Sequence, residues 1–195
     1  KGVIKKMTAQ MEIRSLDIEP DFNEEEGVVR GHPILFNTRS SDLGGFDEII
    51  DPDALADVDI SDVALLYDHQ SGNILARASA GTLKLEVGSE GVSFVATLPK
   101  TTVGNDVREN LRNGNLRGMS FGFTVAEREW LNRDEQIPTQ VIKRIGKLFE
   151  ISLTAFPAYK QTDVALSQRS LDQFRNQELE LQAQKEWFAI QKLRH

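Results

Sequence analysis

The sequence predicts a mainly β protein with helices, of the α+β class, and three observations lead to this prediction. Up to about residue 160, short stretches rich in Val, Ile, Leu and Phe are separated by Gly, Asp and Asn, as consecutive strands and turns require. The segment "EVGSEGVSF" places Gly88 and Gly91 between two alternating runs, which is typical of a β-hairpin. Helical patterns are confined to a few segments. The expected strands cover residues 11–18, 28–36, 63–69, 75–80, 82–87, 92–98, 119–126, 140–145 and 148–156.

One helix is expected inside the β-rich part, at "TTVGNDVRENLRNG". Thr101 or Thr102 can cap its start. An apolar face repeats every four residues, and a glycine is placed to end the helix in a left-handed cap. These positions are Val103, Val107, Leu111 and Gly114. A short second helix is expected at 52–58.

The composition changes after Thr162, where the chain lacks Gly and Pro and is rich in Gln, Glu, Leu and Lys. This segment predicts a terminal amphipathic helix with an interrupted apolar stripe. The stripe consists of Leu171, Phe174, Leu181 and Phe188, with Glu178 and Lys185 breaking it. Either the helix packs on its own domain or it docks a partner. We therefore divide the chain into an extension at 1–10, a β-rich domain at 11–165 and a helix at 166–195.

The composition also narrows the classes of function. The 195 residues carry a formal net charge of −7, which argues against nucleic acid as a partner, because a phosphate-binding surface needs clustered Lys and Arg. There is no cysteine, which excludes disulfides, cysteine-based zinc sites and thiol catalysis. No apolar run is long enough for a membrane span, and "KGVIKKMTAQ" lacks the apolar core of a signal peptide. Without an H-E-x-x-H motif, no metal site is expected.

The stretch "GNLRGMSFGF" contains the pattern G-x-S-x-G around Ser120, which matches the nucleophile elbow of α/β-hydrolases. An elbow needs a strand before the serine and a helix after it, whereas here a helix and a turn precede Ser120 and an alternating strand follows it. Hydrolase triads also place the histidine last, and the only histidine after Ser120 is the terminal His195, a poor place for a catalytic base. Ser120 is therefore not an elbow serine, but it remains a candidate nucleophile whose base lies upstream.

A serine hydroxyl needs an adjacent base to become a nucleophile. With His195 set aside, the candidates are His32, in "RGHPILF", and His69, which closes "VALLYDHQSG". Because strand ends and adjoining loops present catalytic side chains on a rigid scaffold, we favour His69. The alternative is that His69 is an ordinary surface or hydrogen-bonded histidine.

Glu150 is the candidate for the acid that orients the histidine, because it is the only acid in the apolar strand "KLFEISLTAFPAY". An ionised carboxylate there costs on the order of several kcal/mol unless it is paired. Strand alternation places Glu150, Ser152 and Thr154 on one face of their strand, and Ser120, Gly122 and Thr124 on one face of theirs. If the two strands are neighbours in one sheet, Ser120 and Glu150 face the same site. The alternative is that these two strand faces are merely exposed to solvent. Asp68 is a rival acid, but it points away from its neighbour His69.

The order histidine, serine, acid and several motifs resemble the tailed-phage prohead maturation proteases, the caudovirus prohead serine protease family. The resemblance covers roughly residues 11 to 165. It rests on six motifs in order: "GHPILFN", "GGFDEIIDPDAL", "VALLYDHQ", "LARASAGTLKLEVGSEGVSFVATLP", "GNDVRENLRNGNLRGMSFGF" and "LFEISLTAFPAYKQT". One such motif is weak, whereas six in this order and spacing are specific.

The resemblance implies a function and a set of roles. It implies that His69 is the general base, Ser120 the nucleophile and Glu150 the third member. It implies an assemblin-like fold, a mostly antiparallel β-barrel surrounded by helices, and no cofactor. The implied substrates are scaffold protein, the scaffold segment of the major capsid protein, and the protease itself, inside the assembling prohead in the host cytoplasm. Self-association is a further expectation.

The oxyanion hole is expected from backbone N–H groups of the turn "FPAYK", through Ala158 or Tyr159. The competing hypothesis is a non-enzymatic capsid assembly or scaffold module that keeps the protease fold. Intact His69, Ser120 and Glu150 favour the enzyme.

Overall fold

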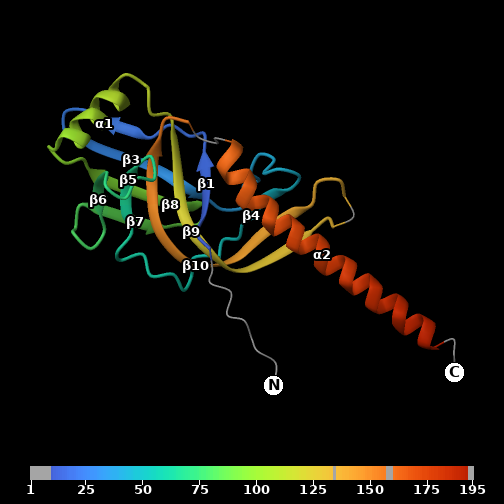
Figure 1. Cartoon of the computed structure of the whole chain (residues 1–195). Coiled ribbons are helices and arrows are strands. Elements are labelled where there is room, and N and C mark those ends of the chain that lie inside the picture. The colour runs from blue at the N-terminus through green and yellow to red at the C-terminus, as the bar shows by residue number, and fades with distance from the viewer. Residues whose placement is uncertain (1–9, 134, 157–159, 193–195) are drawn as a thin grey trace.

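Two long strands, β9 (Gly118–Leu131) and β10 (Thr139–Thr154), organise the fold. The computed structural model describes residues 10–133, 135–156 and 160–192 (Figure 1). The two strands pair antiparallel in a six-stranded sheet with the order β1-β9-β10-β5-β6, and β4 also pairs with β10. The shorter strands of this sheet are β1 (Glu12–Leu16), β4 (Asp47–Ile50), β5 (Ala64–Tyr67) and β6 (Ile74–Arg77). The second half of β10 therefore lies between β9 and β5, the arrangement on which the candidate site depends.

A second sheet of four strands packs on the first. Its order is β2-β3-β8-β7, with β2 (Asp21–Asn23), β3 (Val28–Leu35), β7 (Leu83–Val87) and β8 (Gly91–Thr97). Apolar side chains from both sheets, among them Phe94 and Phe121, belong to one buried cluster. The described strands thus form two sheets around a shared core and not the closed barrel that the resemblance implied. The α+β class is confirmed, and so is the hairpin, in which the N–H of Gly88 donates to the carbonyl of Gly91 at 2.8 Å.

The expected strands differ from the observed ones mainly along β10. The segments predicted at 140–145 and 148–156 are one strand, whose pairing with β9 shifts register at several points between Ile142 and Glu150. Bulges of this kind bend a strand without ending it. They interrupt the alternation of apolar and polar residues, and in the sequence this interruption resembles the end of a strand. The short β2 and the acidic β4 were not predicted.

The internal helix α1 (Thr102–Arg112) is confirmed, with Thr101 as its N-cap accepting from the N–H of Gly104 at 3.2 Å. Gly114 has a φ of 67°, as a left-handed C-terminal position requires. The helix predicted at 52–58 is wrong. The segment forms successive turns in which Ala54, Ala56 and Val58 each donate to the carbonyl three residues earlier.

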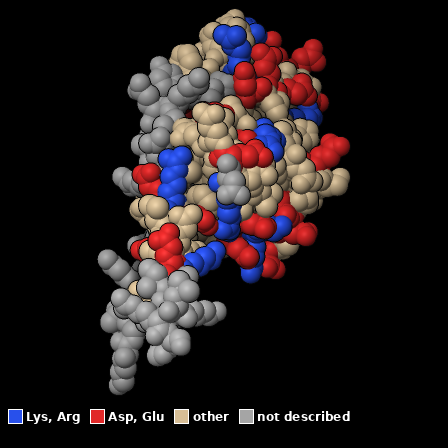
Figure 2. Space-filling model, turned by 90° about the vertical axis from the view of Figure 1, so that its right-hand side faces the viewer, with Lys and Arg blue, Asp and Glu red and all other residues tan. Residues whose placement is uncertain are grey.

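The terminal helix α2 (Lys160–Lys192) packs on the domain through the first part of its apolar stripe. Leu171 and Phe174 are buried in a cluster with Phe46 and Trp130, and the rings of Trp130 and Phe174 stack at 4.7 Å. Leu181 is 48% exposed, and the side chain of Phe188 lies outside the described residues. Beyond the packed part, the helix projects away from the sheets (Figure 1). Acidic and basic side chains are interspersed over the face shown in Figure 2.

A buried ion pair joins β1 to β4. Arg14 donates from Nε and Nη2 to the two carboxylate oxygens of Glu48, both at 2.8 Å, and from Nη2 to Glu12 at 2.7 Å. The side chains of Arg14 and Glu48 are 7% and 3% exposed. Burial alone lowers the pKa of Arg14, but the charges and hydrogen bonds of Glu48 and Glu12 raise it above its ordinary value. The guanidinium therefore stays charged in the interior.

Replacing Glu48 with alanine is expected to lower the free energy of unfolding by about 3–5 kcal/mol, because it leaves the buried charge of Arg14 without its main partner. Urea unfolding of the full chain measures this. Glu24→Ala is the matched control, since it breaks an exposed pair with Arg112 and is expected to cost less than about 1 kcal/mol. If the two substitutions lower the free energy of unfolding equally, the buried pair of Arg14 and Glu48 does not have the structural role assigned to it.

Candidate active site

Three neighbouring strands bring the candidate catalytic residues to one face of the six-stranded sheet. Ser120 on β9 lies opposite Ser152 on β10, and Gly122 lies opposite Glu150. Strand β5 runs along the other side of β10, and His69 follows its last residue, Tyr67, by two positions. The strands that carry Ser120 and Glu150 are therefore neighbours. Their shared face is not solvated, since Ser120 is 0% and Glu150 5% exposed.

The structure brings His69 and Glu150 together. Nδ1 of His69 lies 2.8 Å from Oε1 of Glu150, and the two side chains are 22% and 7% exposed. A carboxylate can only accept, so Nδ1 carries a proton and Nε2 is the basic nitrogen of the neutral ring. The rival Asp68 is exposed, and His32 is exposed on β3 of the other sheet. Of the described histidines, His69 is thus the one held by a buried carboxylate.

A turn with unusual backbone geometry presents His69. Asp68 and His69 have φ values of 53° and 58°, in the left-handed region that non-glycine residues rarely adopt. The strand predicted through residue 69 ends at Tyr67, because the next two N–H groups turn toward β10. Asp68 donates to the carbonyl of Leu153 at 3.0 Å, and His69 donates to the hydroxyl of Ser152 at 3.2 Å.

Ser120 shares this face but makes its hydrogen bonds to β1. Its hydroxyl donates to the carbonyl of Arg14 at 2.8 Å and accepts from the hydroxyl of Ser15 at 3.0 Å. Among the described contacts, it is bonded to β1 and not to His69. Ser15 and Ser152 were not among the predicted site residues. The alternation of "EIS" placed Ser152 beside Glu150, whereas nothing in the sequence indicated that β1 pairs with β9.

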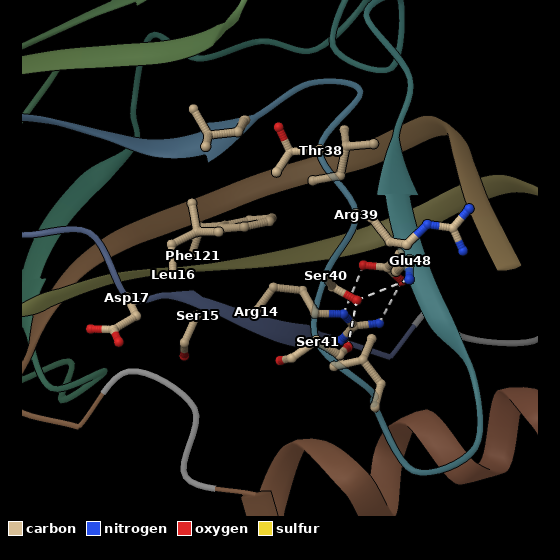
Figure 3. Close-up of a pocket in the computed structure, with 13 residues that line it drawn as sticks. Arg14, Ser15, Leu16, Asp17, Thr38, Arg39, Ser40, Ser41, Glu48 and Phe121 are labelled. Atoms are coloured by element: carbon tan, nitrogen blue, oxygen red, sulfur yellow. Dashed lines mark hydrogen bonds and ion pairs between the residues drawn. The ribbon is translucent and has the colours of Figure 1, made fainter. Parts of the chain in front are cut away.

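A pocket of about 250 Å³ lies beside β1 (Figure 3). Apolar side chains supply much of its wall, and Ser15 and Arg14 contribute from β1. The apolar lining residues are Leu16, Leu35, Leu43, Ile50 and Phe121. Ser15 both lines this pocket and hydrogen-bonds to Ser120. The pocket therefore adjoins a residue that is hydrogen-bonded to the candidate nucleophile.

Gly122 leaves the space that Glu150 occupies. A Cβ atom at Gly122 would lie 2.5 Å from Oε1 of Glu150, the atom that contacts His69. Gly122→Ala is expected to displace the carboxylate and to lower the cleavage rate by about 100-fold, the scale of an ångström-sized misplacement. Steady-state cleavage of a peptide substrate measures this, with Gly72→Ala as the control because a Cβ there meets nothing within 4 Å. Full activity of Gly122→Ala would contradict a role for the Glu150 geometry.

The expected oxyanion-hole residues, Ala158 and Tyr159, lie outside the described residues. Within the described ranges, no group of three or more His, Cys, Asp or Glu side chains is placed to hold a metal ion. None of the described helices has the length and apolar character needed to cross a membrane.

The sheet face that carries Ser120 also carries the contact between His69 and Glu150. A serine, a histidine and a carboxylate are the side chain types from which serine hydrolase sites are built. The chain belongs to the caudovirus prohead serine protease family, whose sequence model matches residues 10–177. It is 28% identical over 159 residues to the prohead protease of Enterobacteria phage HK97, covering 76% of this chain and 63% of that relative. This chain thus spans less than two thirds of that protein. The structure of the bacteriophage T4 capsid assembly protease, gp21, is similar with a TM-score of 0.46 and 11% identity, over 74% of this chain and 97% of that one.

Proposed function

We propose that the chain is a serine endopeptidase of prohead maturation, which cleaves scaffold protein or the scaffold segment of the major capsid protein, and also itself. The observation that carries the proposal is the contact between His69 and the buried carboxylate of Glu150 on the sheet face that Ser120 shares. Membership of the caudovirus prohead serine protease family supports the choice of substrate class. The site of action would be the interior of the assembling prohead, in the host cytoplasm.

The proposed reaction is acyl transfer. Ser120 turns from the carbonyl of Arg14 toward Nε2 of His69, which takes the hydroxyl proton as the oxygen attacks the peptide carbonyl. Glu150, as a carboxylate, stabilises the imidazolium and fixes its tautomer. His69 then passes the proton to the departing amine, and water releases the acyl group from Ser120. Backbone N–H groups at Ala158 or Tyr159 remain our candidates for the oxyanion hole.

A non-enzymatic assembly module is the second candidate, and one observation favours it. The Ser120 hydroxyl is fully buried and bonded to β1. Such a serine suits a protein that keeps the fold without the chemistry.

Co-assembly with the capsid protein separates the two candidates. The full chain is expressed with the major capsid protein and its scaffold, and new termini are mapped by mass spectrometry. A protease produces defined cleavage sites in the scaffold segment, and a fluorophosphonate probe labels Ser120 in the same particles. Assembled particles with intact capsid protein and no label would instead support the assembly module.

A further inference from the structure

Ser152 contacts both the candidate base, His69, and the carboxylate that lies against its imidazole, Glu150. Its hydroxyl donates to Oε2 of Glu150 at 2.6 Å and accepts from the backbone N–H of His69 at 3.2 Å. The residue is 1% exposed. It also lies opposite Ser120 in the pairing of β9 with β10. One buried hydroxyl therefore lies between the nucleophile strand and the histidine loop and bonds to the acid and to the backbone of the base.

The bond to Glu150 fixes the direction of the carboxylate. One carboxylate oxygen contacts Nδ1 of His69, and the other accepts from Ser152. With both oxygens engaged, the carboxylate plane cannot rotate without losing a charge-assisted hydrogen bond. Oε1 is thereby aimed at the imidazole.

The bond to the His69 backbone holds the turn that presents the imidazole. Two successive non-glycine residues with positive φ form a strained backbone, which persists only where the surroundings hold it. Two contacts to β10 do so here, from Asp68 to the carbonyl of Leu153 and from His69 to the hydroxyl of Ser152. The second depends on a side chain and can be removed by substitution.

We propose that Ser152 is a positioning residue, which holds the His69 turn and the Glu150 carboxylate in the geometry that general-base catalysis requires. This inference rests on the proposed protease function. Ser152 does not react with the substrate; its effect is transmitted through His69 and Glu150. The side chain at position 152 has to be small, because it lies between the strand of Ser120 and the loop of His69 in the order β9-β10-β5. It has to carry a hydroxyl, because that group makes the bonds to Glu150 and to the His69 backbone.

The test compares Ser152→Ala with Ser152→Thr, which keeps the hydroxyl. Ser152→Ala is expected to lower kcat by about 10- to 100-fold, the scale of a hydrogen bond to a charged group, with KM within about twofold of the original. Ser152→Thr is expected to recover at least part of that loss. Thr154→Val is the matched control on the same face of β10, because the Thr154 hydroxyl is buried without a partner among the described atoms. It is expected to leave kcat unchanged.

A spectroscopic readout reports on geometry without turnover. In the full chain labelled with ¹⁵N-histidine, the Nδ1–H proton of His69 is expected to give a downfield resonance that Ser152→Ala shifts or broadens and Thr154→Val leaves in place. Unchanged kcat and an unchanged resonance in Ser152→Ala would overturn the inference. If the unmodified chain cleaves nothing, the proposed function fails, and the resonance alone then decides whether Ser152 positions His69.

Discussion

Replacing Ser120 with alanine is expected to lower the cleavage rate by about 10⁶-fold, as loss of the nucleophile does in a well-studied serine protease. The expected cause is chemical, because the substitution removes the only atom that forms the acyl bond. The fold should persist, since among the described residues the Ser120 hydroxyl bonds to Arg14 and Ser15 on β1, and the backbone pairing with β10 does not depend on it. Cleavage of the capsid protein, followed by gel and mass spectrometry, measures the rate, and circular dichroism with urea unfolding checks the fold.

Ser93→Ala is the matched control for this experiment. Ser93 is a half-buried serine on β8, in the other sheet, and its removal is expected to leave cleavage unchanged. If purified Ser120→Ala cleaves as fast as the original chain, Ser120 is not the nucleophile. A folded but inactive Ser120→Ala beside an active Ser93→Ala would assign the chemistry to Ser120.

Local patterns predicted much of the fold, because they follow from periodicity that each element carries in its own sequence. Helix α1 was found from its cap, its apolar repeat and its terminal glycine. Strand β4 was missed because "DEII" begins with two acids, whose burial depends on arginines elsewhere in the chain. Glu48 pairs with Arg14, 34 residues earlier, and Asp47 pairs with Arg39. The prediction of a helix at 52–58 is wrong because composition does not distinguish turns, whose N–H groups bond to the carbonyl three residues earlier, from an α-helix, whose N–H groups bond four residues earlier.

The candidate site shows the same division between local and distant information. Strand alternation put Ser120 and Glu150 on corresponding faces, and the isolation of Glu150 in an apolar strand indicated that it needs a partner. The contact with His69 at 2.8 Å is consistent with that reasoning. The left-handed turn at His69 and the bonds from Ser120 to β1 depend on which strands are neighbours, and a single sequence does not carry that information.

The bonds of Ser120 to β1 also bear on how the proposed protease would be controlled. A hydroxyl that donates to the carbonyl of Arg14 cannot at the same time donate to His69. In the proposed mechanism the Ser120 hydroxyl therefore exchanges the carbonyl of Arg14 for Nε2 of His69 as its acceptor. Because β1 is held by the buried pair of Arg14 and Glu48, this acceptor on β1 is fixed in place.

Replacing Glu150 with glutamine is expected to lower the cleavage rate by about 10⁴-fold, less than the loss of Ser120, following the pattern of the orienting acid in a serine protease triad. The amide is nearly the size of the carboxylate, so packing on β10 is retained. The negative charge that stabilises the imidazolium is lost, and the amide can donate to Nδ1 of His69 and select the wrong tautomer. The same cleavage assay measures the rate, with Glu86→Gln, an exposed acid on β7, as the control.

The double variant Ser120→Ala/Glu150→Gln completes this test. Residues that act as one unit have strongly non-additive effects, so the double variant is expected to be no slower than Ser120→Ala alone. Undiminished cleavage by Glu150→Gln would remove Glu150 from the catalytic site. A further loss in the double variant would show that Glu150 acts independently of the nucleophile. Glu150 would then be a structural residue that the contact with His69 allows to be buried.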